Sequence, residues 1–494
     1  MDRRRTAGLA VALACAILGA PIALGDHARA TDRPAISCSR ASTAPLVPAA
    51  APSAPSTVRL VTSTAPTQGS LPTWRGRWDY VDVPDGLMEP RSGAQITVDR
   101  FVTLEAAIWG GTGTDGRPLS DGALLDAASG TWLPMLPAPL CPRTDVVVTT
   151  GQEDTNGFLV YGGRDAAGHW LDDGAWYDRP SGRWTIVPPS GLPAGPAVAA
   201  ALTVVVRDPA TGLASASRLK LDFGPSGWTT PATVPLAPAA AYSAVALEDD
   251  DVLVVAERPG GEASMVVRDW SPDQGQWRSV ADLPNGIGGS VGTASGFALE
   301  RPLSALVRET PQGVRVLRID TTHEAGTWLA GRAAPEGVTF DPHPVVSPDH
   351  LISPSSLVAY DLLHDSWQRL PRPRQADQIT FDGPSWWFEG KLYLMGHLTG
   401  QPGTIVEAFT PRLPAGSYAL PTIERGSTDC QRWRVAGAPG DADHVWLVRG
   451  DRRIVIGWPD GWTVRYDPLR IFDSTGAIVR RGGQAMPTCI GSGG

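Results

Sequence analysis

A tryptophan recurs through the middle of the chain at intervals of 39 to 54 residues, and this period constrains the fold more than any other feature. Each of these residues follows a short polar turn, and a proline-containing stretch comes within a few residues after it. The recurring residues are Trp78, Trp132, Trp184, Trp228, Trp277, Trp328 and Trp367. A repeat of about 40–50 residues is typical of the four-stranded sheets of β-propellers, so the sequence predicts an all-β fold.

Two repeats are complete enough to show the order of their strands. In the first, an apolar strand ends at Gly110-Gly111, and a polar loop and a second strand lead to Trp132. The second has the same order, with Gly162-Gly163 and the strand 173–178. These units resemble kelch repeats, a resemblance that implies a propeller of the kelch and galactose oxidase-like type. Double glycines allow a tight turn, and the tryptophan is expected to pack between neighbouring blades.

The two ends of the repeat region determine the number of blades. Trp78 stands before the first complete repeat and has no inner strands of its own, whereas residues 377–412 contain apolar segments with no outer tryptophan strand. We expect the strand around Trp78 to complete this last sheet, because closure removes the exposed edges of an open array. The prediction is a seven-bladed propeller over residues 74–414. The alternative is six blades, with Trp78 in an independent strand.

The segments on either side of the propeller have different compositions. Residues 1–30 contain a basic start at Arg3, Arg4 and Arg5, an apolar stretch and a small-residue cleavage site, which together predict a signal peptide rather than a retained membrane anchor. Residues 31–73 are rich in Ala, Pro and Ser and are predicted to be a linker. Residues 415–494 alternate apolar and polar positions and predict a small β domain. We expect a secreted or cell-envelope protein with no transmembrane segment once the signal is removed.

Four cysteines remain after the predicted signal: Cys38, Cys141, Cys430 and Cys489. An even number in an exported chain suggests disulfides, and four cysteines allow three pairings. Cys430 and Cys489 bracket the C-terminal segment, so we predict that pair, which leaves Cys38 with Cys141. Because the cysteines are far apart in sequence, zinc binding is not expected.

Several function classes find no support in the sequence. The net charge is -9 and no long basic run occurs, so nucleic-acid binding is not expected. Walker-type nucleotide-binding and His-Glu-x-x-His zinc-protease motifs are absent. The family resemblance also raises the possibility of a copper radical oxidase. Such an enzyme needs paired His and Tyr ligands, and the spacing of the histidines does not suggest them. Asp341-Pro342-His343 and Asp349-His350 are interpreted as solvated loops, so we expect neither metal nor cofactor.

The loops on one face of the propeller are the candidate binding region. Loops that join the second and third strands of a blade, and loops between blades, lie on this face. Their polar, cationic and aromatic groups suit a protein, peptide or glycan ligand. The candidate ligand-binding residues are Arg91, Asp115, Arg117, Arg143, Arg164, Asp165, His169, Arg374 and His397. Pro-Arg pairs before inner strands are common in kelch repeats and often structural, which is the alternative for Arg91, Arg143 and Arg374.

These observations predict a monomeric, exported binding scaffold with no catalytic residues. The enzyme alternative is a glycan-active propeller, sialidase-like or galactose-oxidase-like, whose residues converge from several blades. A single turn, Ser271–Trp277, resembles the Asp-containing turns of sialidases. A third possibility is a display protein held at the cell envelope by the 41–73 spacer.

Overall fold

The structure is a computed structural model, and it describes the chain from residue 58 to residue 472 with gaps. The described ranges are 58–62, 69–98, 105–126, 130–151, 157–221, 225–246, 251–257, 263–269, 276–280, 292–295, 303–310, 313–320, 326–341, 344–347, 350–362, 365–373, 376–388, 391–399, 403–411, 422–425, 433–436, 446–449, 452–455, 462–464 and 470–472. Every regular element in these ranges is a β-strand. The same ranges hold no helix with the length and hydropathy needed to cross a bilayer.

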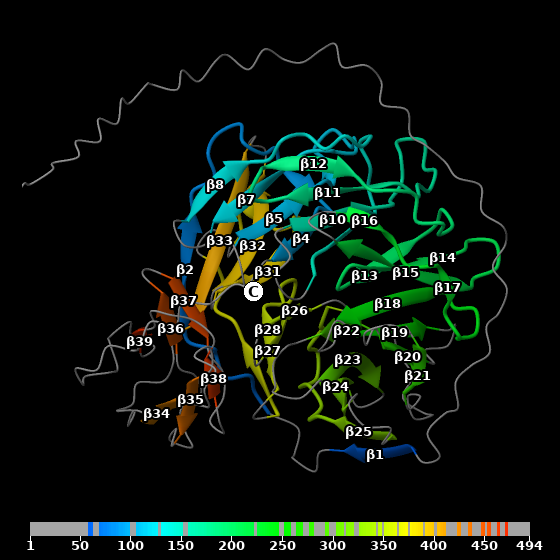
Figure 1. Cartoon of the computed structure of the whole chain (residues 1–494). Helices are drawn as coiled ribbons and strands as arrows, with labels where there is room; N and C mark the ends of the chain where they lie inside the picture. The colour runs from blue at the N-terminus through cyan, green and yellow to red at the C-terminus, as the bar shows by residue number, and fades with distance from the viewer. Residues whose placement is uncertain are drawn as a thin grey trace, which may run out of the picture. The chain divides into compact units, whose positions relative to one another are not determined.

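The strands form antiparallel sheets set around a common centre, which is the architecture of a β-propeller (Figure 1). Within each sheet the chain runs from the innermost strand outward. The first sheets contain β4 (Gln95–Val98), β5 (Glu105–Trp109), β7 (Gly122–Asp126) and β8 (Thr131–Pro134); β9 (Val147–Thr149), β10 (Gly157–Tyr161), β11 (Gly174–Asp178) and β12 (Arg183–Ile186); and β13 (Ala197–Ala200), β14 (Thr203–Arg207), β15 (Ala214–Leu221), β16 (Pro225–Trp228) and β17 (Ala232–Thr233). A short ribbon, β3 (Arg91–Ser92) with β6 (Thr112–Gly113), lies beside the first of them in sequence.

The later sheets follow the same order. They contain β18 (Ala241–Ala246), β19 (Val252–Glu257), β20 (Ala263–Asp269) and β21 (Gln276–Ser279); β22 (Gly292–Ser295), β23 (Leu303–Thr310), β24 (Gly313–Asp320) and β25 (Gly326–Ala330); β26 (Val345–Val346), β27 (His350–Ser353), β28 (Val358–Asp361) and β29 (Ser366–Arg369); and β30 (Ile379–Thr380), β31 (Ser385–Phe388), β32 (Lys391–Leu398) and β33 (Thr404–Pro411). In the last of these, β30 and β31 both pair with β32. The innermost edge of that sheet is therefore interrupted by the bend between them.

An N-terminal strand completes the last sheet. β2 (Gly76–Val81) pairs antiparallel with β33, with Trp78 opposite Phe409. This confirms the predicted pairing of the strand around Trp78 with residues 377–412. It also joins the two ends of the repeat region by backbone hydrogen bonds, so neither end leaves an open edge there.

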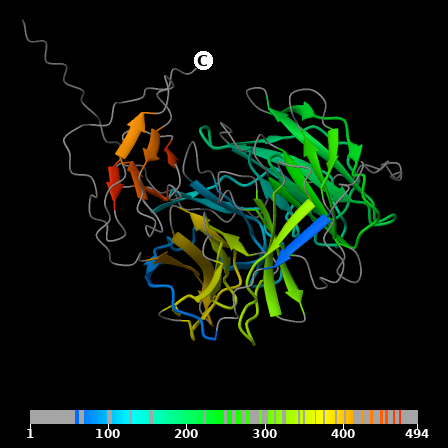
Figure 2. The ribbon, with the colours of Figure 1, turned by 90° about the horizontal axis from the view of Figure 1, so that it is seen from below.

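The chain before β2 covers the outer edges of two further sheets. β1 (Val58–Thr62) pairs in parallel with β25, as Figure 2 also shows. Thr73 then forms a parallel bridge to Arg369 at the end of β29, and the Trp74 amide donates to the Arg369 carbonyl at 2.7 Å. The predicted linker 31–73 thus contains a strand, which its Ala/Pro/Ser-rich composition did not indicate because an added edge strand needs no apolar period.

The repeating tryptophans lie between neighbouring sheets, as predicted. Trp328, for example, is fully buried in an apolar cluster with Leu253 and Val267 of the preceding sheet. Each of the other six belongs to, or packs against, a different cluster of this kind. Radial sheets diverge away from the axis, and a large flat ring fills the widening gap.

Several of these indole rings also carry a hydrogen bond to the preceding sheet. The Nε1 atoms of Trp78, Trp184, Trp228 and Trp367 donate to the carbonyls of Pro371, Leu136, Pro188 and Arg332, at 2.7–2.9 Å. Each acceptor lies four residues after the tryptophan of the preceding repeat. Apolar packing and a directional bond together therefore fix the position of one sheet against the next.

The C-terminal strands form two three-stranded sheets. One contains β34 (Thr422–Arg425), β35 (Trp433–Ala436) and β38 (Trp462–Val464), and the other β36 (Trp446–Arg449), β37 (Arg452–Val455) and β39 (Arg470–Phe472). Residues 415–494 thus have the predicted β character where they are described. The boundaries of a separate domain there stay a prediction.

Candidate ligand-binding site on the loop face

Arg143, a predicted ligand-binding residue, is completely buried and fully used within the fold. Its Nε donates to the Cys141 carbonyl at 2.9 Å, and its Nη1 donates to the Gly162 carbonyl at 3.1 Å. Nη1 and Nη2 contact the two carboxylate oxygens of Asp173 at 2.6 and 3.1 Å, and Nη2 lies 3.2 Å from the Cys141 Sγ. All five guanidinium N–H groups therefore have partners, and none remains for a ligand.

Arg91 occupies the same place one repeat earlier. It is 2 % exposed, donates from Nη1 to the carbonyls of Gly110 and Asp121 at 3.1 Å, and forms an ion pair with the Asp121 carboxylate. In both repeats the aspartate lies 30 residues after the arginine, directly before a Gly-Ala pair. Asp121 and Asp173 are site partners that sequence reasoning missed, although this spacing could have revealed them.

We call each buried arginine, with the glycine carbonyl and the aspartate that it binds, an arginine clamp. The double glycine makes this clamp sterically possible. Gly110 and Gly162, whose carbonyls the arginines bind, have φ near 70°. A Cβ at the following glycine would lie 2.7 Å from the Ser92 carbonyl in one repeat, and one at Gly163 would lie 2.5 Å from the Thr144 carbonyl in the other. Only glycine fits this close approach between the loop inside one sheet and the connection that precedes it. Arg91 and Arg143 therefore hold the fold, and we do not place them in the binding surface.

The loop after Gly163 is exposed but organised by its own contacts. The Arg164 guanidinium lies 3.9 Å from the centre of the Trp170 ring and 3.4 Å from Asp145. Asp165 accepts hydrogen bonds from the amides of Ala167 and His169 at 2.9 Å, and its other oxygen lies 3.1 Å from His169 Nδ1. The backbone hydrogen bond from His169 is the main cause that holds the Asp165 pKa below its usual value.

The corresponding loop of the preceding sheet has a similar turn. Asp115 accepts a hydrogen bond from the Arg117 amide at 2.9 Å and pairs with its guanidinium, and the backbone bond is the main cause that lowers the Asp115 pKa. The Arg117 side chain is 82 % exposed. These groups face solvent and are not gathered around a cavity.

The last two predicted residues lie near the closing sheet. His397, near the end of β32, has its Nδ1 3.1 Å from an Asp382 carboxylate oxygen, and both side chains are partly buried. Arg374 lies outside the described residues. The structure therefore does not bring the predicted residues together in one site: two are buried in the fold, and the other described ones lie in separate loops.

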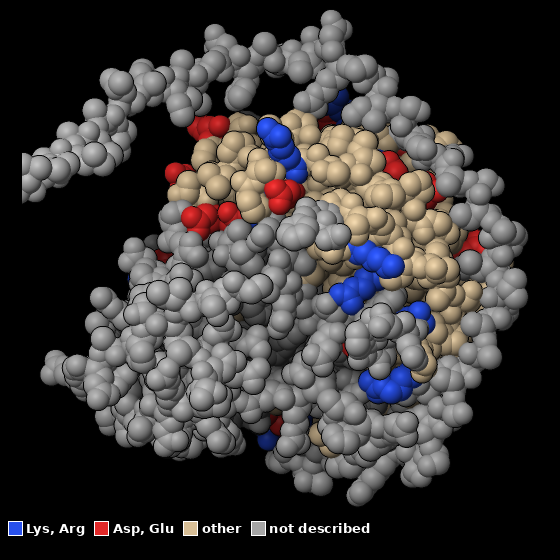
Figure 3. Space-filling model, in the orientation of Figure 1, with Lys and Arg blue, Asp and Glu red and all other residues tan. Residues whose placement is uncertain are grey.

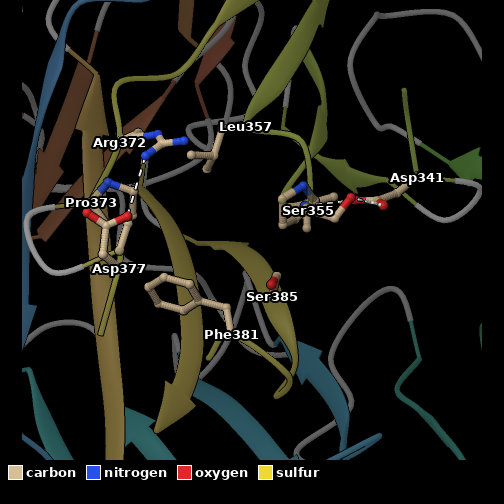
Figure 4. Close-up of a pocket in the computed structure, with 11 residues that line it drawn as sticks. Asp341, Ser355, Leu357, Arg372, Pro373, Asp377, Phe381 and Ser385 are labelled. Atoms are coloured by element: carbon tan, nitrogen blue, oxygen red, sulfur yellow. Dashed lines mark hydrogen bonds and ion pairs between the residues drawn. The ribbon is translucent and has the colours of Figure 1, made fainter. Parts of the chain in front are cut away.

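A pocket does lie on the predicted face, in sheets other than those that carry most of these residues. Its volume is about 630 Å³, within the usual range of about 300–1,000 Å³ for small-ligand sites. It is bounded by the segment before β26, the β27–β28 turn, the β29–β30 connection and the β30–β31 bend (Figure 4). The lining residues are Asp341, Val345, Pro354, Ser355, Leu357, Arg372, Pro373, Ala376, Asp377, Phe381 and Ser385. None of the predicted binding residues that the structure describes is among them.

The charged groups of the pocket differ in how firmly they are held. The Asp341 carboxylate accepts hydrogen bonds from Ser353 Oγ at 2.9 Å, from the Ser355 amide at 3.1 Å and from Ser355 Oγ. Arg372 Nη1 lies 3.5 Å from Asp377 Oδ1, and both side chains are highly exposed. Figure 4 shows Arg372 and Asp377 on one side, with Asp341 and Ser355 on the other. A fixed carboxylate thus faces an open ion pair across a partly apolar cavity.

Other kinds of site find little support among the described residues. They contain no group of three or more His, Cys, Asp or Glu side chains that could hold a metal ion. On the side seen in Figure 3, their basic and acidic side chains are scattered and form no continuous basic surface. Cys38, Cys430 and Cys489 lie outside the described residues, so both predicted disulfide pairings stay predictions. No protein-family model matches the chain, and no curated protein was found to be similar to it.

Proposed function

We propose that this chain is an exported, kelch-type propeller that acts as a binding scaffold, with its ligand in the pocket between the β26–β29 sheet and the closing sheet. The observation that carries the proposal is the pocket itself. It has the size of a ligand site, lies on the face where propeller loops gather, and is walled by connections from neighbouring sheets. A rigid ring of sheets that presents adjustable loops is suited to recognition.

We further propose that the propeller has seven blades. The first strands of successive sheets contact one another in the order β4, β9, β13, β18, β22, β26 and β31, and β31 contacts β4 again. Seven sheets in one closed ring account for this order and for the seven repeating tryptophans. The kelch assignment is supported by the two double-glycine turns and by the tryptophan period.

Export and disulfide formation belong to the same proposal. The basic and apolar N-terminus supports a signal peptide. The pairing of Cys38 with Cys141 is supported by the burial and disulfide-bonded state of Cys141. Peptide mapping of the secreted, non-reduced protein should find the Cys38–Cys141 and Cys430–Cys489 cross-links; free thiols at these positions would contradict both pairings.

The binding function is tested with arrays of glycans and short peptides. Wild-type protein is compared with the double variant Asp377→Ala/Phe381→Ala, which removes an exposed carboxylate and an apolar wall of the pocket. The control is Asp115→Ala, an Arg-paired aspartate of the same face outside the pocket. Binding retained by the control and lost by the double variant is expected, and equal binding by all three proteins would contradict the proposal.

Turnover of reporter glycosides by the same three proteins tests the enzyme alternative. The scaffold proposal expects no turnover. Turnover that the control keeps and the pocket variant loses would instead establish a glycan-active propeller.

A further inference from the structure

We infer that the pocket takes a cationic group on an apolar stem, that is, an arginine or lysine side chain presented by a peptide. The inference rests on the proposed function, since it names the ligand class for the same pocket. It is carried by the balance of charges around the cavity, by the way one carboxylate is held, and by the apolar walls between the charged groups.

The charge balance of the described lining residues is negative. Among them two carboxylates, those of Asp341 and Asp377, face one guanidinium, that of Arg372. Arg372 is already paired with Asp377, so its charge is partly offset before any ligand arrives. The charge left over is that of Asp341, and an incoming cation is favoured over an incoming anion.

Asp341 is arranged as a receptor for such a cation. The donors that fix its carboxylate are hydroxyl and amide groups of Ser353 and Ser355, all of them neutral. Among the described residues no guanidinium or ammonium group lies within ion-pair distance of Asp341. Its orientation is therefore set in advance, and no described cationic group compensates its charge. Binding of a ligand cation requires no further ordering of this side chain.

The walls between the charged groups suit an aliphatic stem. Val345, Leu357 and the Phe381 ring line the cavity, together with Pro354 and Pro373. Arginine and lysine side chains bury their methylene stems on such surfaces while the charged end reaches a polar partner, and a cation can also lie over the phenyl face. In Figure 4 the Phe381 ring lies on the side of the pocket that carries the Arg372–Asp377 pair, away from Asp341.

A glycan fits this lining less well than a basic side chain. Sugar recognition uses many donors and acceptors around the hydroxyl groups, whereas the Ser355 hydroxyl already donates its hydrogen to Asp341. Most of the remaining lining is aliphatic or proline. The lining therefore favours the peptide.

The test measures binding of three fluorescein-labelled pentapeptides by fluorescence anisotropy, identical except for a central Arg, Gln or Glu. We expect the Arg peptide to bind at least about tenfold more tightly than the Gln peptide, and the Glu peptide to bind most weakly. Raising the salt concentration should weaken the Arg peptide selectively.

Variants of the lining residues test whether each charged side chain strengthens or weakens binding of the Arg peptide. Asp377→Asn changes an almost fully exposed side chain and should weaken the Arg peptide about three- to tenfold, whereas Arg372→Gln should strengthen it by a similar factor. Asp341→Asn should weaken it further. Because Asp341 also has internal hydrogen bonds, Asp377→Asn and Arg372→Gln keep the test valid if that variant folds poorly. Asp115→Asn, on the same face but outside the pocket, is the control and should change nothing.

Two results would overturn the inference. The first is tighter binding of the Glu peptide, or weaker binding of the Arg peptide in Arg372→Gln. The second is failure of all three peptides to bind while array ligands still depend on Phe381, which would leave the proposed function standing and make the ligand class wrong. Loss of pocket dependence in the arrays would instead remove the proposed function itself.

Discussion

The buried arginine clamp allows a quantitative test of how the sheets are joined. Replacing Arg143 with leucine removes the whole set of donors that bind the Cys141 and Gly162 carbonyls and the Asp173 carboxylate. Leucine has roughly the volume of the arginine stem but satisfies none of these acceptors. The variant therefore separates the polar contribution of the clamp from the filling of space.

The magnitude follows from burial. Breaking a buried ion pair by removing one partner costs about 3–5 kcal/mol, because the other partner is left buried and uncompensated. The Arg143 side chain is fully buried, but the Asp173 side chain is 26 % exposed and can recover some water. We therefore expect a loss near the lower end, about 3 kcal/mol. Arg117→Leu removes an 82 % exposed arginine from a similar Asp pair and should cost about 0–1 kcal/mol.

The assay is urea unfolding followed by both tryptophan fluorescence and far-ultraviolet circular dichroism. A double-mutant cycle with Asp173→Leu isolates the pair, and the double variant should be less destabilised than the sum of the two single ones. Arg143→Leu with a loss below about 1 kcal/mol, no larger than that of Arg117→Leu, would refute the clamp. A coupling energy near zero between Arg143 and Asp173 would also refute the clamp.

Three other outcomes are expected. Trp184→Phe keeps an aromatic ring but loses the indole N–H donor, and should lower the free energy of unfolding by about 1 kcal/mol more than Trp132→Phe, whose indole N–H has no acceptor among the described residues; equal losses in urea unfolding would contradict this. Replacing Val58–Thr62 with a Gly-Ser sequence removes the β1 pairing while keeping Cys38, and should raise hydrogen exchange in β25 but not in β12; unchanged exchange in β25 would show that the edge pairing is absent. Because the Asp165 pKa is lowered from 3.8, the stabilisation of its loop should be complete above that value and be lost as the pH falls through the lower folded-state pKa. A carboxyl carbon titration by NMR checks this, and a midpoint above 3.8 would reverse the sign.

Much of the fold could be predicted because its signals are local and repeat. A tryptophan once per sheet marks the outer strand, and the double glycines mark the end of the second strand, since both positions impose the same steric demand in each repeat. The pairing of the Trp78 strand with the last sheet could also be predicted. The Trp78 strand had no inner strands of its own, and residues 377–412 had no outer tryptophan strand. The strand β1 could not be predicted, because it is added in parallel outside a sheet that already has its four strands, so no repeat lacked a strand for it to supply.

The candidate site was much less accessible from the sequence. Arg143 and Arg117 are both arginines in polar connections. The preceding proline offered a structural interpretation of Arg143, but only the fold shows that its guanidinium is buried. The pocket depends on four segments between residues 341 and 385 that meet only when two sheets are placed side by side.

The order of residues by itself determined that sheets would form, where their outer strands lie and which strand closes the last one, because these features depend on spacing and on sterics within one repeat. Only the tertiary structure decided which charged side chains are buried and which face a cavity, because burial is set by the neighbouring sheet and not by the repeat that carries the residue.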